Sequence, residues 1–129
     1  MSDAIDAELA RAREDLGASQ ALIDAGFRAQ AVTSAYFAAF HAATAALLVL
    51  GESRSKHSGA ISAFGELVVR DGGFDRPTAK VLSGLFDDRH EADYDLGVVS
   101  SEEVRESLAD ARRFVEAVGN WVASRQSSA

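Results

Sequence analysis

The sequence predicts an all-α protein, an up-and-down bundle of four to five helices. Hydrophobic residues make up 47% of the chain, alanine dominates them, and there is only one proline. Alanine favours helix most and proline least. Apolar residues recur at steps of three and four, whereas no segment shows the alternation of a strand. A chain of 129 residues can bury one core. We therefore expect a single domain over 1–129, with its core at about 3–123 and a frayed tail at 124–129.

The first helix is predicted from its cap and its apolar stripe. Ser2 and Asp3 can cap its start, and Gly26 and Phe27 mark its end. The stripe between them recurs at helical spacing and consists of Ile5, Leu9, Ala12, Leu16 and Ile23.

The second helix is predicted from about Arg28 to Leu50, with Gly51 as its C-terminal cap. Nearly all of its faces are small or apolar, so it should be the central helix of the bundle. It is long enough to span a bilayer, but Tyr36 and His41 fall within it, and we interpret it as a buried bundle helix rather than a membrane span. The N-terminus lacks a basic segment followed by an apolar core, so no secretory signal is expected and we predict a cytoplasmic location.

Two further helices follow the polar segment "GESRSKHSG", residues 51–59, which we predict to be a loop. The third helix should carry an apolar stripe and end at "RDGG". Asp75 then caps a fourth helix, with Pro77 in its first turn, where a missing backbone N–H costs little. The stripe of the third helix consists of Ile61, Phe64, Leu67 and Val68.

The last helix begins at a capping box, in which Ser100 precedes Glu103 by three positions. Its apolar residues alternate in steps of four and three, which is a coiled-coil-like seam that needs a partner helix. This seam, together with the alanine-rich second helix, indicates a homodimer. The seam consists of Val104, Leu108, Ala111, Val115, Val118 and Val122.

Composition limits the classes of function. The net charge is −7 and there is no basic stripe, so broad binding to duplex DNA is not expected. A local phosphate pocket remains compatible with this charge. The chain has no cysteine, and its three histidines, at 41, 57 and 90, lack the spacing of a metal site. No phosphate loop, dinucleotide fingerprint or nucleophile elbow occurs, so we expect no cofactor and no metal.

Charge is concentrated in "LFDDRHEADYDLG", residues 85–97. Arg89 continues the apolar stripe of the fourth helix, and Asp93 lies one turn further on. One interpretation is a structural ion pair, because a semi-buried arginine needs a carboxylate partner. The other is a phosphate clamp, because a guanidinium can bind phosphate oxygens bidentately. Tyr94 could simply cap the core, and His90 should be exposed.

Two other histidines could contribute to a site. His41 lies with Phe37 on the second helix as an i,i+4 pair, as Tyr36 does with Phe40, and a histidine on such a face is usually a satisfied core residue. The loop brings Arg54, Lys56 and His57 close to the start of the third helix. Backbone donors and cations there could bind an anion, while a solvated loop is the alternative.

Three segments in this order, "SAYFAAFHAATAALLVLG", "KHSGAISAFGELVV" and "LFDDRHEADYD", resemble the HEPN family, in particular its small prokaryotic single-domain branch. The resemblance covers about residues 3–123. It implies a helical bundle that dimerises and a toxin of a toxin–antitoxin pair, whose antitoxin is a minimal nucleotidyltransferase. Many members of the family are metal-independent ribonucleases.

The active motif of that family is an arginine followed after four to six residues by a histidine. Arg89 matches the arginine, but the expected positions hold Tyr94, Asp95 and Leu96. Ribonuclease activity therefore does not follow from the resemblance, unless His41 or His57 lies near Arg89. By resemblance, Tyr94 could receive nucleotidyl groups from the partner enzyme. The candidates for catalysis are Arg89, Asp93, Tyr94 and His41, and those for binding of phosphate or nucleotide are Arg89, Lys56 and His57.

Two functional hypotheses follow. The first is a HEPN protein of toxin type that engages RNA or nucleotide phosphate through Arg89. The second is a non-catalytic helical interaction or dimerisation module in which Arg89, Asp93 and Tyr94 are structural. The missing histidine and the acidic charge favour the second, whereas the family resemblance leads us to predict the first.

Overall fold

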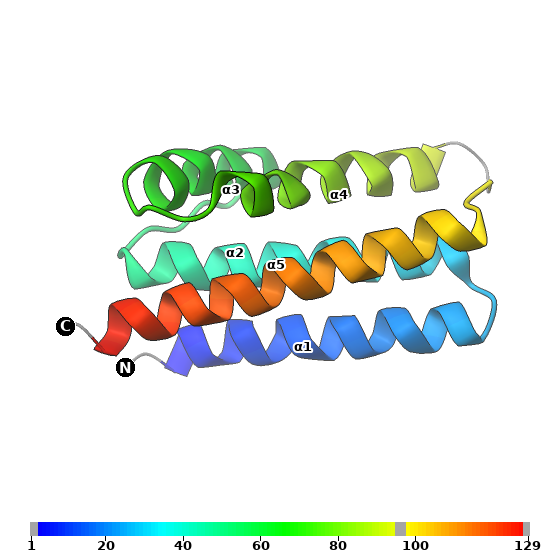
Figure 1. Cartoon of the computed structure of the whole chain (residues 1–129), viewed down its shortest axis with the longest axis horizontal. Coiled ribbons are helices and arrows are strands. Elements are labelled where there is room, and N and C mark those ends of the chain that lie inside the picture. The colour runs from blue at the N-terminus through cyan, green and yellow to red at the C-terminus, as the bar shows by residue number, and fades with distance from the viewer. Residues whose placement is uncertain (1–2, 95–97, 128–129) are drawn as a thin grey trace.

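The computed structural model describes residues 3–94 and 98–127, but not the side chain of Tyr94. Ser2, which we expected in the first cap, lies outside these residues. The described part of the chain is helical and has no strand, which confirms the predicted all-α class (Figure 1). The helices are α1 (Asp3–Asp24), α2 (Arg28–Val49), α3 (His57–Ala63), the π-helix η1 (Phe64–Arg70), α4 (Arg76–Tyr94) and α5 (Ser101–Ser127).

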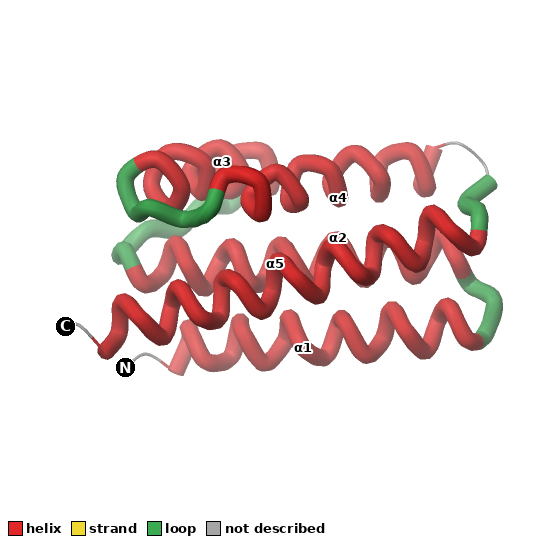
Figure 2. The backbone as a smooth tube through the Cα atoms, viewed as in Figure 1, coloured by secondary structure: helices red, strands yellow, loops and turns green. Residues whose placement is uncertain are grey.

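The three longest helices, α1, α2 and α5, run side by side along the molecule, and α3, η1 and α4 form a layer over them (Figure 1). The connections are short, and the start of α1 and the end of α5 lie at the same end of the bundle (Figure 2). Every other helix contacts α2, which is therefore the central helix, as predicted.

Alanine explains how α2 can be central. Eight of its eleven buried residues are alanines, so neighbouring helices can approach it closely on several sides. By length and composition α2 could cross a membrane. In the structure its small side chains are buried among the other helices, which agrees with the interpretation as a core helix.

The seam of α5 is used inside the chain. All six of its predicted residues are buried, and α5 packs against α1, α2 and α4. The partner helix that the heptad-like spacing required is therefore supplied by the same molecule. Our inference of a homodimer from this seam loses its basis, because the apolar stripe has no surface left for a second copy.

The predicted helix ends form with specific geometry. Gly26 and Gly51 adopt φ values of 88° and 75°, in the left-handed region that glycine tolerates best. Asp75 accepts a hydrogen bond of 3.0 Å from the backbone N–H of Thr78. Ser100 and Glu103 bond each other reciprocally, with the Glu103 N–H donating to the Ser100 hydroxyl at 3.0 Å and the Ser100 N–H donating to the carboxylate at 3.2 Å.

Three details differ from the sequence prediction. The third helix begins at His57, within the segment expected to be loop, and its second half is the π-helix η1. In η1 the wider turn buries Phe64, Val68 and Val69 together against the core. The last helix continues to Ser127, whereas we expected a frayed tail from residue 124.

Candidate functional site

Arg89 lies where α4 crosses α2, above the buried residues Leu82 and Leu85 of its own helix. Its guanidinium carbon is 5.1 Å from the ring centroid of Phe37 and 5.5 Å from that of Tyr36. A cation over aromatic faces is attracted by their quadrupoles. The side chain is 28% exposed, so it is anchored on the rings while part of it reaches solvent.

The predicted pair of Arg89 with Asp93 is present. The Nε atom of Arg89 is 3.3 Å from an Asp93 carboxylate oxygen. This Nε is nevertheless buried and makes no hydrogen bond within the described residues, because the orientation of the pair is unfavourable. The contact is thus an ion pair without a directed hydrogen bond, and the guanidinium keeps donor capacity for another oxygen.

The phenol of Tyr36 lies next to Arg89 and is fully buried. Its oxygen is 2.7 Å from Nδ1 of His57. Burial raises the pKa of Tyr36 to about 12, although the charge of Arg89 opposes this. The hydroxyl therefore keeps its proton at neutral pH and can donate it to Nδ1.

His57 is kept neutral by its surroundings. Burial lowers the pKa of this imidazole, and the positive charges of Arg89 and of His41 lower it further. If Nδ1 accepts the Tyr36 proton, the neutral ring carries its own hydrogen on Nε2. His57 then offers an N–H donor close to the guanidinium of Arg89. Its ring stacks on Phe40, with centroids 4.0 Å apart.

All three histidines of the chain lie on one aromatic-rich surface of α2, α3 and α4. His41 contacts Phe37 and Phe40, and His90 stacks on Phe86, which in turn contacts Tyr36. As predicted, His90 is exposed. We call this surface the aromatic face. It consists of Tyr36, Phe37, Phe40, His41, His57, Phe86, Arg89 and His90.

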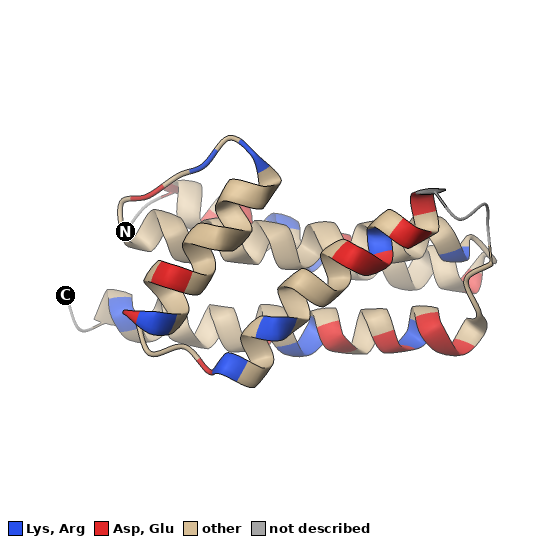
Figure 3. Ribbon diagram, turned by 90° about the horizontal axis from the view of Figure 1, so that it is seen from above, with Lys and Arg blue, Asp and Glu red and all other residues tan. Residues whose placement is uncertain are grey.

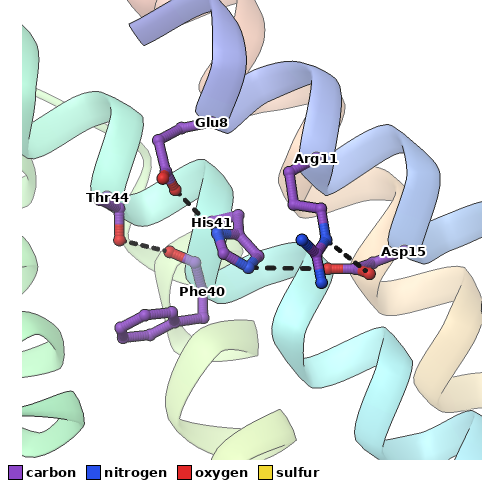
Figure 4. Close-up of polar contacts among 6 residues, drawn as sticks. All are labelled: Glu8, Arg11, Asp15, Phe40, His41 and Thr44. Atoms are coloured by element: carbon purple, nitrogen blue, oxygen red, sulfur yellow. Dashed lines mark hydrogen bonds and ion pairs between the residues drawn. The ribbon is translucent and has the colours of Figure 1, made fainter. Parts of the chain in front are cut away.

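His41 forms the edge of the aromatic face toward α1. Its Nδ1 is 2.7 Å from a carboxylate oxygen of Glu8, and its Nε2 is 3.8 Å from Asp15 (Figure 4). The expectation of a satisfied core histidine was therefore only half correct. The ring has partners, but they are two carboxylates, and the side chain is 22% exposed.

The three residues of the loop site that we considered at the start of the third helix have different contacts in the structure. Arg54 bonds to Glu52 at 2.9 Å and to the Ser53 carbonyl at 2.8 Å. Lys56 is exposed at the start of α3 and gives no side-chain cap. His57 packs on Tyr36 and Phe40 of α2. The side chain of Tyr94 lies outside the described residues.

Sequence reasoning named Arg89 together with its partner Asp93, but it missed the partners of His41 and His57. The sequence indicated Tyr36 only as one of an aromatic pair, although its hydroxyl lies 2.7 Å from Nδ1 of His57. Glu8 comes from another helix, 33 positions away from His41, and nothing in its local sequence distinguishes it from other acids of α1.

The described residues contain no group of three or more potential ligands that could hold a metal ion. A separate cleft between α4 and α5 has an acidic rim, and burial raises the pKa of Asp88 within it. A phosphate would be repelled there, so the aromatic face is the better anion site. The acidic rim consists of Asp88, Glu91, Glu103, Glu106 and Asp110.

Comparison with known proteins gives a family and similar proteins. The HEPN domain family matches residues 6–121. The "Putative toxin MJ0605" of Methanocaldococcus jannaschii is 31% identical over 107 residues, which span 83% of this chain and 80% of that protein. A "UPF0332 protein" of Thermotoga maritima is 33% identical over 109 residues, spanning 84% and 83%. The "UPF0332 protein PH1297" of Pyrococcus horikoshii is 39% identical over 70 residues, spanning 54% and 49%.

The helical bundle, the order of the sequence segments that build the aromatic face, and a family match over nearly the whole chain agree with one another. The chain belongs to the HEPN family.

Proposed function

We propose that this chain is a HEPN protein of toxin type that binds the phosphate of RNA or of a nucleotide through Arg89. The observation that carries the proposal is the position of Arg89. Its guanidinium lies over two aromatic rings and is partly exposed, and its buried Nε makes no hydrogen bond. The similarity to a protein that is named as a toxin supports the toxin part of the proposal.

Phosphate binding needs N–H donors of Arg89 that do not contact Asp93. A guanidinium has five N–H donors in a planar fork, and the contact with Asp93 involves the Nε side. The terminal nitrogens can therefore meet two phosphate oxygens. His57 adds a neutral N–H donor nearby. It can donate a hydrogen bond to a phosphate oxygen, while Arg89 supplies the positive charge.

The aromatic rings around Arg89 favour an unpaired nucleobase over a duplex. Phe37, Phe40 and Phe86 are each partly exposed. Bases of single strands stack on such rings, whereas a duplex is bound mainly through many phosphate contacts. The net charge of −7 disfavours many contacts of that kind. We therefore infer a single-stranded RNA or a free nucleotide as the ligand.

The proposal extends to partners. By family resemblance we expect a minimal nucleotidyltransferase as antitoxin, with Tyr94 as the residue that would receive a nucleotidyl group. The test is to incubate the two purified proteins with nucleoside triphosphates and to measure the mass of this chain. We expect an added nucleotidyl mass that is lost in Tyr94→Phe; an added mass that persists in Tyr94→Phe contradicts this role.

We also propose a homodimer, for a reason other than the seam of α5. In α4, Arg76 and Lys80 are exposed in the first half, whereas Asp87 and Glu91 are exposed in the second half, with Arg89 between these acids (Figure 3). Two antiparallel copies of α4 would bring opposite charges together across a two-fold axis. In sedimentation, Lys80→Glu should favour the monomer, and adding Glu91→Lys should restore the dimer. A parent protein that stays monomeric overturns the homodimer.

The experiment for the central proposal is a binding titration with fluorescently labelled single-stranded RNA. Arg89→Ala should weaken binding at least about tenfold, because hydrogen bonds to charged groups contribute about 1.5–3 kcal/mol. The matched control is Arg113→Ala, which removes one positive charge from an exposed position of α5. A parent protein that binds no RNA or nucleotide overturns the proposal, as do equal effects of the two substitutions.

The second candidate is the non-catalytic interaction module, and the ion pair of Arg89 with Asp93 is the observation that favours it. In that case Arg89 would only join α4 to the rings of α2. Arg89→Ala would then lower thermal stability and leave RNA binding unchanged, which is the opposite of the result expected above.

A further inference from the structure

A groove of about 230 Å³ lies between η1 and α4, in the layer that covers the three long helices (Figure 1). Three of the side chains that line it, those of Phe64, Val69 and Leu82, belong to the buried core. Ile61 of α3 and Ala79 of α4 also line it and are partly buried. The groove therefore has an apolar floor. It shares no residue with the aromatic face and is a surface separate from the proposed phosphate site.

Two cations of α4, Arg76 and Lys80, also line the groove, and both are exposed. Within the described part of the chain, neither side chain forms an ion pair. Their positions are also unfavourable for the helix. Arg76 is the first residue of α4, where the helix dipole disfavours positive charge, and like charges four residues apart repel each other. The chain thus keeps two cations beside the groove at positions where they do not stabilise the fold.

Gly65 lines the groove from η1. It is exposed and lies within a helix, where glycine is less favourable than alanine. A Cβ atom at this position would meet nothing within 4 Å, so the packing of the chain does not require glycine here. The missing side chain leaves open space beside the apolar floor. The π-helical turn that carries Gly65 points in the same direction, because such turns are frequent at functional sites.

We propose that this groove binds an acidic amphipathic helix of a partner protein. Apolar side chains of that helix, spaced three or four residues apart, enter the groove and cover Ile61 and Ala79. Its carboxylates pair with Arg76 and Lys80. In this mode of recognition the apolar anchors supply most of the affinity, and the charges at the rim select the partner.

The lining favours a protein over RNA as the occupant. The two cations would suit phosphate, but Phe64 is only 1% exposed, so the groove offers no aromatic face on which a base can stack. A second copy of the chain is also less suitable. Among the described residues the exposed large apolar side chains are Phe27 (54%) and Val98 (84%), and both lie in connections between helices. A second copy therefore has no helix whose exposed apolar anchors could fill the groove.

The test is a fluorescence titration with a synthetic helical peptide that has leucines at steps of three and four and glutamates elsewhere. We expect saturable binding by the parent protein. A second peptide, in which lysine replaces each glutamate, should bind at least about tenfold more weakly, because like charges repel at the rim. Arg76→Gln should weaken binding of the acidic peptide about two- to fivefold, as for other exposed ion pairs.

Gly65→Leu tests the groove itself. Its side chain fills the open space, while the α4 charges used in the proposed homodimer stay unchanged. This substitution should weaken binding of the acidic peptide at least about tenfold, the loss typical of a buried anchor, with the helical circular dichroism intact. The matched control is Gly84→Leu, which adds the same side chain at an exposed position of α4 outside the groove, where a Cβ also meets nothing within 4 Å. It should leave peptide binding unchanged.

RNA binding and sedimentation of each variant are measured in parallel. A parent protein that does not bind the acidic peptide overturns this proposal, as do equal affinities for the two peptides or equal effects of Gly65→Leu and Gly84→Leu. If Gly65→Leu abolishes RNA binding or converts a dimer to a monomer, the groove belongs to RNA or to a second copy, and the partner helix is overturned. A parent protein that binds the peptide but no RNA overturns only the proposed function, because the groove and the phosphate site share no residue.

Discussion

The hydroxyl of Tyr36 lies 2.7 Å from Nδ1 of His57, and this contact joins the buried centre of α2 to the first residue of α3. Because Nδ1 faces the Tyr36 hydroxyl, Nε2 is the nitrogen of His57 that can face a ligand. The contact also ties the ionisation of a buried phenol to that of a half-buried imidazole, and two of the predictions below follow from it.

The ionisation of Tyr36 can be followed by the ultraviolet absorbance of phenolate. In Tyr94→Phe it is the only tyrosine left. Burial raises its pKa to about 12, so the native protein should still hold most of this phenol protonated at pH 11. The urea-unfolded chain should titrate near the ordinary value of about 10. A native midpoint near 10, with the helical circular dichroism intact, contradicts the burial of this hydroxyl.

The lowered pKa of His57 predicts a pH dependence of stability. Since the folded state holds this ring neutral more strongly than the unfolded state does, the unfolded chain binds the extra proton first as the pH falls. The free energy of unfolding should therefore decrease as the pH falls below about 6.5, the ordinary value for histidine. Urea denaturation at pH 5 and pH 7.5 measures the difference. In His57→Gln this difference should become smaller. An unchanged difference would mean that other groups cause the pH dependence of the free energy of unfolding.

Asp93→Ala tests the ion pair with Arg89. The two side chains are 28% and 42% exposed, so solvent screens much of their attraction. We expect a loss of about 0.5–1 kcal/mol in the free energy of unfolding, as for other partly exposed pairs. Glu116→Ala, at an exposed position of α5, serves as the control in chemical denaturation. A loss of several kcal/mol would mean that Arg89 is stranded as a buried charge.

Gly72→Ala tests the packing of the turn after η1. A Cβ atom at this position would lie 2.6 Å from the Val68 carbonyl oxygen and 2.8 Å from the ring of Trp121. Trp121 cannot withdraw easily, because its Nε1–H donates to the Gly72 carbonyl at 3.0 Å. Overpacking of this kind costs about 1–3 kcal/mol.

The control for Gly72→Ala is Gly17→Ala, where a Cβ meets nothing within 4 Å in the middle of α1. There we expect a gain of up to about 1 kcal/mol, because alanine favours helix. Thermal unfolding of both variants measures these two changes in stability. Equal changes in the two proteins would contradict the tight packing against Trp121.

Local signals in the sequence predicted most of the fold. Gly26, Gly51, Asp75 and the Ser100–Glu103 box each determine a helix end through hydrogen bonds to nearby backbone, so short-range patterns suffice for them. The π-helix was not predicted, because Phe64 and Val68 fit an α-helical stripe as well. The seam of α5 was recognised, but its partner was assigned to a second copy, since periodicity does not tell which helix covers a stripe.

The candidate site was predicted only in part, for a related reason. Arg89 and Asp93 are one turn apart on one helix, and their contact follows from helical geometry. The contact of His41 with Glu8 spans 33 positions and that of Tyr36 with His57 spans 21. Such pairs depend on how the helices pack, and the sequence around each residue contains no sign of the other.

Helix α2 contributes alanines to the core and four residues to the aromatic face. A methyl group added at one of those alanines would push α2 along or around its own axis. Tyr36, Phe37 and His41 would then shift as a rigid block against Arg89, which is anchored on a different helix. Substitutions deep inside the bundle should therefore change ligand affinity without touching any residue that meets the ligand.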